Sequence, residues 1–246
     1  MRHVHTGRSP EVGNRRHRLW NDLHGDQTPG HQGRKQAVSA KAEKELICVP
    51  IVHTAADMGG LARSARRLAV SKLGRQTWRQ SVDVIGQMWA HIRRTVEGWE
   101  IPWEKVRLYQ DGLPLCGREK EIARDLAKAG SPNHQLLVSL MSKGATLMGT
   151  ESGELIVEEY RLAQEILAAK DPEDADRIEA QHKARSRSLI VCRDHFIAGR
   201  INESLRAGEI GLLFLGLLHS IEPHLAKGIR VSYPIYKPRY PRRGTR

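Results

Sequence analysis

Short apolar runs alternate with longer amphipathic stretches through most of this chain. Five runs are apolar enough for buried strands, and they fall at 46–52, 106–110, 145–149, 210–215 and 229–233. None of them shows the strict alternation of polar and apolar residues that is typical of a half-exposed antiparallel strand. The runs therefore predict strands that are covered on both faces.

The stretches between these runs repeat their apolar residues at helical spacing. They predict helices at about 61–72, 77–97, 118–129, 133–142, 153–169 and 173–205, with a break somewhere in the last. Because strands that alternate with helices are joined by crossovers, we predict an α/β fold. Its expected form is a mostly parallel sheet of about five strands with helices on both faces.

The formal charge of +12 is concentrated at the two ends of the 246-residue chain. Nine basic and four acidic residues give 1–44 a charge of +5, and five basic residues without an acid give 237–246 another +5. Only +2 remains for 45–236. We predict a disordered basic extension at 1–44, a single α/β domain at 45–236 and a basic tail at 237–246.

Cysteine usage and hydropathy indicate the compartment. Cys48, Cys116 and Cys192 are too few and too scattered for a disulfide framework, and there is no CxxC pair to hold zinc. The longest apolar run, 210–218, is shorter than the roughly 20 residues of a membrane-spanning helix. The N-terminus also lacks the apolar segment of a secretory signal. We expect a cytoplasmic protein without membrane association.

Chemically useful side chains follow four of the predicted strands. They are His53, Thr54 and Asp57, then Asp111, then Thr150 and Glu151, and finally Gly216, His219 and Glu222. Ligands of parallel sheets bind beyond the carboxyl ends of the strands, where these residues would meet. Two imidazoles and several carboxylates suit a divalent ion such as Mn, Fe, Co or Zn, whose bound water would be the nucleophile.

Residue roles follow from this arrangement. We predict His53, Asp111, Glu151 and His219 as metal ligands, with the two histidines also serving as catalytic acid/base groups. Asp57 and Glu222 would support the site. Each residue also has an ordinary explanation: Asp57 as a helix cap, Asp111 as a turn residue, Glu151 as a partner of a helix dipole, and His219 as a cap or core histidine.

The predicted helix at 173–205 carries two arginines on its apolar stripe. Arg193 and Arg200 project from the face that bears the apolar residues Leu189, Ile190, Phe196, Ile197 and Ile201. A buried arginine keeps its charge and must meet an anion. We predict a catalytic role for Arg193, clamping a carboxylate or an oxyanion, and a supporting one for Arg200, with structural ion pairs as the alternative. Asp194 lies off the stripe, and we expect it in solvent.

The segment 193–225, RDHFIAGRINESLRAGEIGLLFLGLLHSIEPHL, resembles the C-terminal half of the TraB/GumN/TIKI proteins. These belong with the ChaN-like and erythromycin-esterase-like group. In that pattern a helix with an arginine leads into an apolar strand and a Gly-x-x-His motif, matched here by Gly216–His219. The N-terminal Gly-Thr-x-His pattern is matched at His53 but not at its glycine, and Asp111 stands where those families more often have Glu.

The resemblance implies an α/β fold and metal-dependent hydrolysis of peptide or ester bonds. The leading hypothesis is therefore a metal-dependent hydrolase acting on a small-molecule or peptide substrate. A non-catalytic binding protein of the same fold is the alternative. Since aromatic residues make up only 5 % and no phosphate-binding loop is present, nucleic acid would bind only weakly, through the basic ends. A thiol nucleophile at Cys116 also stays open.

Overall fold

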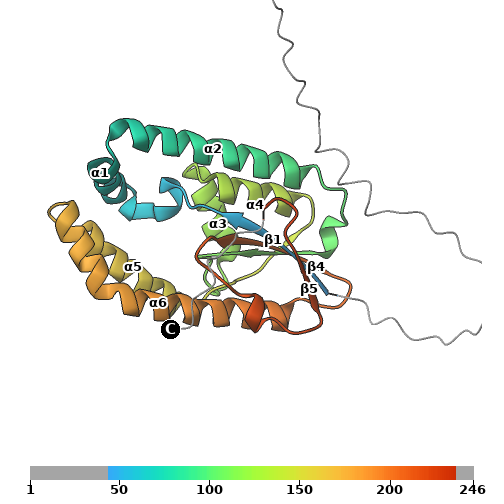
Figure 1. Cartoon of the computed structure of the whole chain (residues 1–246). Coiled ribbons are helices and arrows are strands. Elements are labelled where there is room, and N and C mark those ends of the chain that lie inside the picture. Colours follow the sequence, from blue (N-terminus) through green and yellow to red (C-terminus); the bar gives the residue numbers. More distant parts are fainter. Residues whose placement is uncertain (1–43, 237–246) are drawn as a thin grey trace, which may run out of the picture. The chain divides into compact units, whose positions relative to one another are not determined.

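The computed structural model describes residues 44–236 (Figure 1). The predicted N-terminal extension and C-terminal tail lie outside the described residues, except that Lys44 begins the first strand. The strands are β1 (Lys44–Ile51), β2 (Val106–Gln110), β3 (Thr146–Leu147), β4 (Ile210–Gly216) and β5 (Ile229–Ser232). The α-helices are α1 (Ala62–Leu73), α2 (Arg75–Glu97), α3 (Glu119–Lys128), α4 (Pro132–Ser142), α5 (Gly153–Leu167) and α6 (Pro172–Ser204). Short 3-10 helices are η2 (Ala55–Leu61), η3 (Trp103–Lys105) and η4 (Glu222–His224).

The five strands form one parallel sheet in the order β3-β2-β4-β1-β5. The apolar strand β4 lies at the centre and pairs with β1 and β2. This arrangement confirms the predicted α/β fold. Because all strands run the same way, their carboxyl ends lie along one edge, which we call the carboxyl edge.

Apolar side chains cover both faces of the sheet, as expected for strands without polar alternation. Successive residues of β4 point to opposite sides: Leu212 and Phe214 pack with α2 and α4, whereas Leu213 and Leu215 pack against Ile197 of α6. The sheet is therefore a middle layer between helices on both faces.

The prediction of a break within 173–205 was wrong. α6 is a single helix of 33 residues, which begins at the cap Asp171 and Pro172. Its stretch 176–188 is nearly all polar and extends past the carboxyl edge alongside α5, so it needs no apolar stripe. Arg177 pairs with Asp174 one turn earlier in α6, which supports the helix, and Arg185 pairs with Glu158 of α5, which joins the two helices.

Two helical hairpins, α1–α2 and α5–α6, extend beyond the sheet on either side of the carboxyl edge (Figure 1). α1 and α2 are separated at Gly74, whose φ of 80° is favourable only for glycine. The hairpins contact each other through Lys72, whose Nζ donates to Oδ1 of Asp176 at 2.6 Å. No helix between residues 44 and 236 has the length and apolar character needed to cross a membrane.

Candidate active site

Asp111 stands at the centre of a buried polar cluster on the carboxyl edge. It follows β2 at the start of a turn in which Gly112 has a φ of 80°. Its Oδ1 accepts from Nη2 of Arg193 at 2.7 Å, and its Oδ2 accepts from the backbone N–H of Gly216 at 2.8 Å. Asp111 therefore serves the turn and also joins β2, β4 and α6.

Gly216, the first residue of the Gly-x-x-His segment, is required by the close approach of Asp111 to the backbone. A Cβ built at this position would lie 2.5 Å from Oδ2 of Asp111, so only glycine allows the carboxylate this close to the backbone. The N–H of His219 then returns to the Gly216 carbonyl at 3.1 Å. This turn brings His219 back over the edge, where it is buried.

Glu151 and Arg193 form the second half of the cluster. Both oxygens of Glu151 accept from the Arg193 guanidinium, at 2.5 and 3.0 Å, and Oε1 also accepts from the N–H of Gly112 at 3.0 Å. The remaining Nη1 of Arg193 donates to Glu159 of α5 at 2.6 Å. One buried arginine therefore binds three carboxylates, and this geometry holds Asp111 and Glu151 side by side.

Asp194 corrects the expectation of a solvated residue. Its side chain is buried, and its Oδ1 lies 2.6 Å from Nδ1 of His219 while Oδ2 accepts from the N–H of Ser220. Periodicity assigned Asp194 to the polar side of α6, but the loop after β4 covers that side at this level. The sequence signal that could have identified Asp194 is its position next to Arg193, which was predicted to take part in the site.

His53 is the accessible member of the cluster. It follows β1, its side chain is 42 % exposed, and its Nε2 lies 3.2 Å from Oδ2 of Asp111. Since a carboxylate accepts hydrogen bonds, Nε2 must carry the proton. The neutral ring then has its lone pair on Nδ1, which has no hydrogen-bond partner within residues 44–236.

Asp57 has a structural position next to the site. It accepts from the backbone and hydroxyl of Thr54 at the start of η2, and it forms a short hydrogen bond with Ser131, the cap of α4. Ser131 also contacts Nδ1 of His134 at 2.8 Å. Asp57 therefore fastens the loop after His53 to the start of α4.

Three other candidates lie outside the cluster. Arg200 donates weakly to the carbonyl of Gly149 and pairs with Glu203, and Glu222 accepts from the hydroxyl of Tyr233. Cys116 is exposed. The hydrogen bonds described above for Asp111, Glu151 and Arg193 involve none of these three residues, so the structure does not join them to the buried cluster.

The pKa values of both histidines are raised, although burial and the neighbouring carboxylates act on them in opposite directions. Burial opposes protonation of both rings, but the hydrogen bond to Asp111 and its charge raise the pKa of His53, and the contacts with Asp194 and Asp111 raise the pKa of His219. Burial also opposes ionisation of Asp111, yet His53, His219 and Arg193 keep its pKa low.

Asp111, Glu151 and His219 could hold a metal ion, since one ligand atom from each lies within 4.8 Å of the others. Because Nδ1 of His219 donates to Asp194, Nε2 is the ring atom that faces Oδ1 of Asp111, at 3.6 Å. A metal ion needs this Nε2 unprotonated, whereas the raised pKa of His219 favours a proton there. Arg193 opposes a cation, because its fixed charge already binds both carboxylates.

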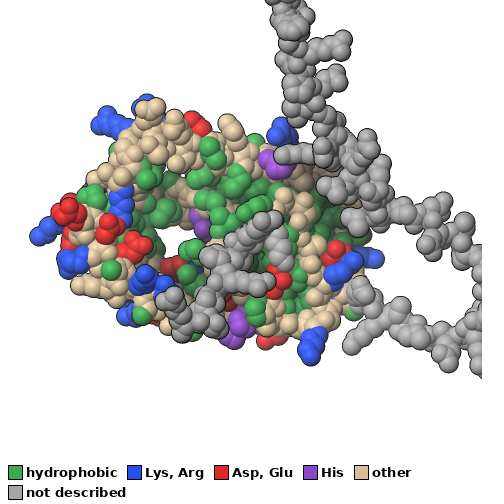
Figure 2. All heavy atoms as spheres, in the orientation of Figure 1, with side chains coloured by type: hydrophobic (Ala, Val, Ile, Leu, Met, Phe, Trp, Pro, Cys, Tyr) green, Lys and Arg blue, Asp and Glu red, His purple; other side chains and the backbone are tan. Residues whose placement is uncertain are grey.

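A large apolar pocket of about 830 Å³ opens beside His53. It lies between η2, α1 and α2, and its walls include Met58, Ile85 and Trp89. Figure 2 shows hydrophobic side chains gathered on this part of the surface, beside the gap between the two hairpins. We call this space the apolar pocket.

Comparisons with protein families, curated proteins and solved structures gave no match for the chain. The resemblance of 193–225 to the TraB/GumN/TIKI proteins therefore stays a prediction. Function has to be argued from the geometry of the carboxyl edge.

Proposed function

We propose that the protein is a hydrolase in which His53, oriented by Asp111, activates water at the mouth of the apolar pocket. One observation carries the proposal. His53 lines the pocket, and its Nδ1 has no hydrogen-bond partner among residues 44–236, while its other nitrogen is held by a buried carboxylate. A base next to a substrate-sized cavity, oriented by an acid behind it, is the arrangement that general-base catalysis needs.

The chemistry follows from the tautomer. Nδ1 of neutral His53 takes a proton from water while the water oxygen attacks the carbonyl carbon of an ester or amide. The imidazolium that forms is stabilised by Asp111, whose charge is fixed by Arg193 and by the N–H of Gly216. The proton then passes from Nδ1 to the leaving oxygen or nitrogen, so His53 acts first as base and then as acid.

Substitution of His53 tests this role. In a panel of p-nitrophenyl esters and short peptides, His53→Ala should reduce kcat by about 100-fold or more, the usual effect of a general base. Imidazole added to the buffer should restore part of the rate, because the half-exposed site leaves room for it. The matched control is His91→Ala, an exposed histidine of α2, which should keep full activity.

Two results would contradict the proposal. One is wild-type protein that hydrolyses none of the esters or peptides. The other is a His53→Ala variant with an unchanged rate, which would place the nucleophile elsewhere.

A metal-dependent route is a second candidate, and it is favoured by the convergence of Asp111, Glu151 and His219. A divalent ion bound there would supply a water of lowered pKa near His53. Mass-spectrometric metal analysis of the untagged full chain, after incubation with Mn, Co or Zn, separates the routes. Near-stoichiometric metal that is lost in His219→Ala but kept in His182→Ala, a control at a histidine that pairs with Glu165 outside the cluster, would support the metal. Equal metal content in both variants would contradict it.

A further inference from the structure

A second hollow lies on the α1–α2 hairpin, away from the carboxylates. Five arginines line it, and we call it the arginine hollow; they are Arg63, Arg66, Arg67, Arg75 and Arg79. Its volume is about 460 Å³, and the remaining walls are Val70 and Trp78. Five like charges on one short hairpin repel one another, so the arrangement destabilises the isolated chain.

These arginines have no acidic partners within the part of the chain that the structure describes. The ion pairs of the hairpin involve Lys72 and Arg93, neither of which lines the arginine hollow. Structural arginines normally have carboxylate partners, as Arg193 does. The five arginines are exposed, so water solvates them in the free protein, and their charges are open to an anionic ligand that enters the hollow.

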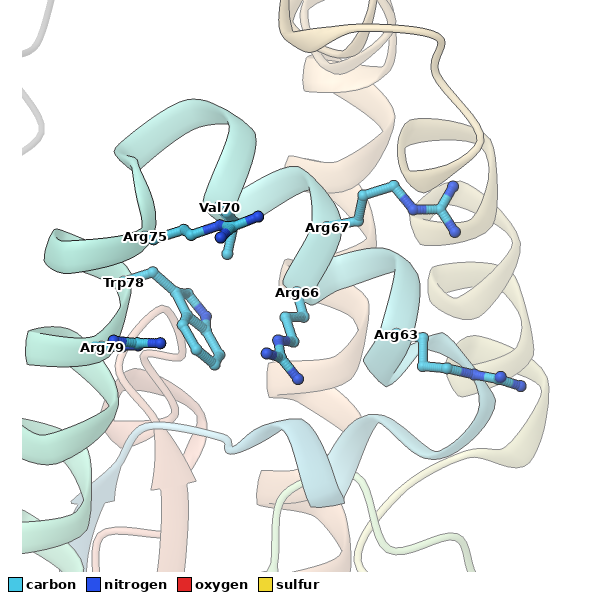
Figure 3. A pocket seen from close by; sticks show the side chains of 7 residues that line it. All are labelled: Arg63, Arg66, Arg67, Val70, Arg75, Trp78 and Arg79. Carbon is cyan, nitrogen blue, oxygen red and sulfur yellow. The ribbon is translucent and has the colours of Figure 1, made fainter.

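Trp78 gives the hollow a rigid wall. The guanidinium of Arg66 lies 4.8 Å from the centre of the Trp78 ring, a cation–π distance. In Figure 3, Arg66 from α1 and Arg75, Trp78 and Arg79 from α2 surround one space, whereas Arg63 and Arg67 extend to the other side of α1. Stacking fixes Arg66 in place, so less side-chain freedom is lost when an anion binds.

The arginine hollow adjoins the apolar pocket. Arg66 and Trp78 line both cavities, and the lining of the apolar pocket also includes Val82, Ile85 and His53. The arginines and His53 therefore lie along two neighbouring cavities. A ligand that fills both must combine an anionic group with an apolar body.

We propose that the substrate is an amphiphilic anion, with a phosphate or carboxylate held by Arg66, Arg75 and Arg79 and an apolar chain in the pocket that ends at His53. The inference rests on the proposed function, because it names the substrate class of the same site. The volume of about 830 Å³ fits a single ligand of drug or lipid-chain size. The chain's own ends do not fit this role, because 1–44 and 237–246 are both strongly basic.

Calorimetric titration of the full chain tests the inference with octyl phosphate, 1-octanol and inorganic phosphate, all kept below micelle-forming concentrations. Octyl phosphate should bind. 1-Octanol and inorganic phosphate should each bind more weakly by about tenfold or more, because one lacks the anionic group and the other lacks the apolar chain. The double variant Arg66→Gln/Arg79→Gln should weaken octyl phosphate by about tenfold or more, through loss of charge-assisted hydrogen bonds. Arg94→Gln/Arg124→Gln, a pair outside both cavities, is the matched control.

A second variant, at Gly86, tests the contribution of the apolar pocket and should leave the fold intact. Gly86 lies in α2 on the pocket wall, and a Cβ added there meets nothing within 4 Å. Gly86→Leu should therefore strengthen the helix while it fills the pocket, and octyl phosphate should bind about tenfold more weakly with phosphate unaffected.

Three outcomes would overturn the inference: octyl phosphate that binds no better than inorganic phosphate, equal binding to the two double variants, or binding to anionic vesicles alone. The last would assign the arginines to a membrane surface. The two proposals fail separately. Octyl phosphate binding without any ester hydrolysis would remove the hydrolase and leave an anion-binding pocket, whereas hydrolysis without octyl phosphate binding would remove only this substrate class.

Discussion

The carboxyl edge buries charged and polar side chains, whereas the α1–α2 hairpin exposes apolar ones. At the edge, Asp111, Glu151, Arg193 and His219 are charged or polar and are buried. On the hairpin, α1 contains no buried residue, and Leu73, Val82 and Val84 are exposed. Burying charge and exposing apolar surface are both costly, so each region indicates a requirement other than stability. In the proposed function, the first region supplies the reactive groups and the second supplies the binding surface.

The largest effect is expected from a substitution in the buried cluster at the carboxyl edge. Among residues 44–236, Arg193 alone binds all three carboxylates, so Arg193→Met leaves Asp111 and Glu151 buried side by side without this charge. The free energy of unfolding should fall by about 3–5 kcal/mol, measured by urea denaturation near neutral pH. Arg200→Met on the same helix is the control and should cost far less, because its partner Glu203 is 70 % exposed. Equal losses in the two variants would mean that the edge cluster is not held by Arg193.

Sequence patterns were sufficient for the sheet because its signal is local. The run at 210–215 is apolar throughout, and such a strand has to lie in the middle of a covered sheet, as β4 does. Strand β3 is shorter than predicted, with only Thr146 and Leu147 assigned to it. Beyond Met148, the N–H of Gln110 in β2 donates to the hydroxyl of Thr150 and the N–H of Thr150 donates to Leu113, so the regular backbone pairing ends. Register and chain order, which decide which strand ends are neighbours, depend on contacts far apart in sequence.

The site was predictable only where a strand end identified the residue. His53, Asp111, Glu151 and His219 each follow a strand, and parallel topology brings all four strand ends to one edge. Asp194 was missed because helical periodicity describes the helix alone and cannot show that a loop covers its polar side. The arginine hollow was missed for a similar reason, since five arginines on an amphipathic hairpin are typical of a solvated face until the cavity between them is seen.

A smaller and pH-dependent effect is expected at Asp57, which fastens the His53 loop. Burial opposes its ionisation, but hydrogen bonds from His134, Ser131 and Thr54 lower the pKa of Asp57 to about 2. A lowered pKa stabilises the fold above the ordinary value of 3.8, and this contribution is lost as the pH falls toward 2. Asp57→Asn should therefore cost about 1–3 kcal/mol at pH 6, and almost nothing relative to wild type near pH 2.

Urea denaturation between pH 6 and pH 2 measures this difference directly. Asp83→Asn, an exposed position of α2, is the control and should match wild type throughout. A gap between wild type and Asp57→Asn that stays constant down to pH 2 would show that the lost hydrogen bonds depend on shape and not on the carboxylate charge.

The smallest effect is expected on the hairpin, and it decides whether the comparison holds. Val82 is 46 % exposed on the pocket wall, whereas Ile92 on the same helix is buried in the core. Val82→Ser should change the free energy of unfolding by less than about 0.5 kcal/mol, while Ile92→Ala should cost about 2–5 kcal/mol. Thermal and urea denaturation of the two variants measure these two changes in the free energy of unfolding. A loss at Val82 close to that at Ile92 would mean that this half of α2 is already covered in the free protein, and its apolar surface would then need no ligand to explain it.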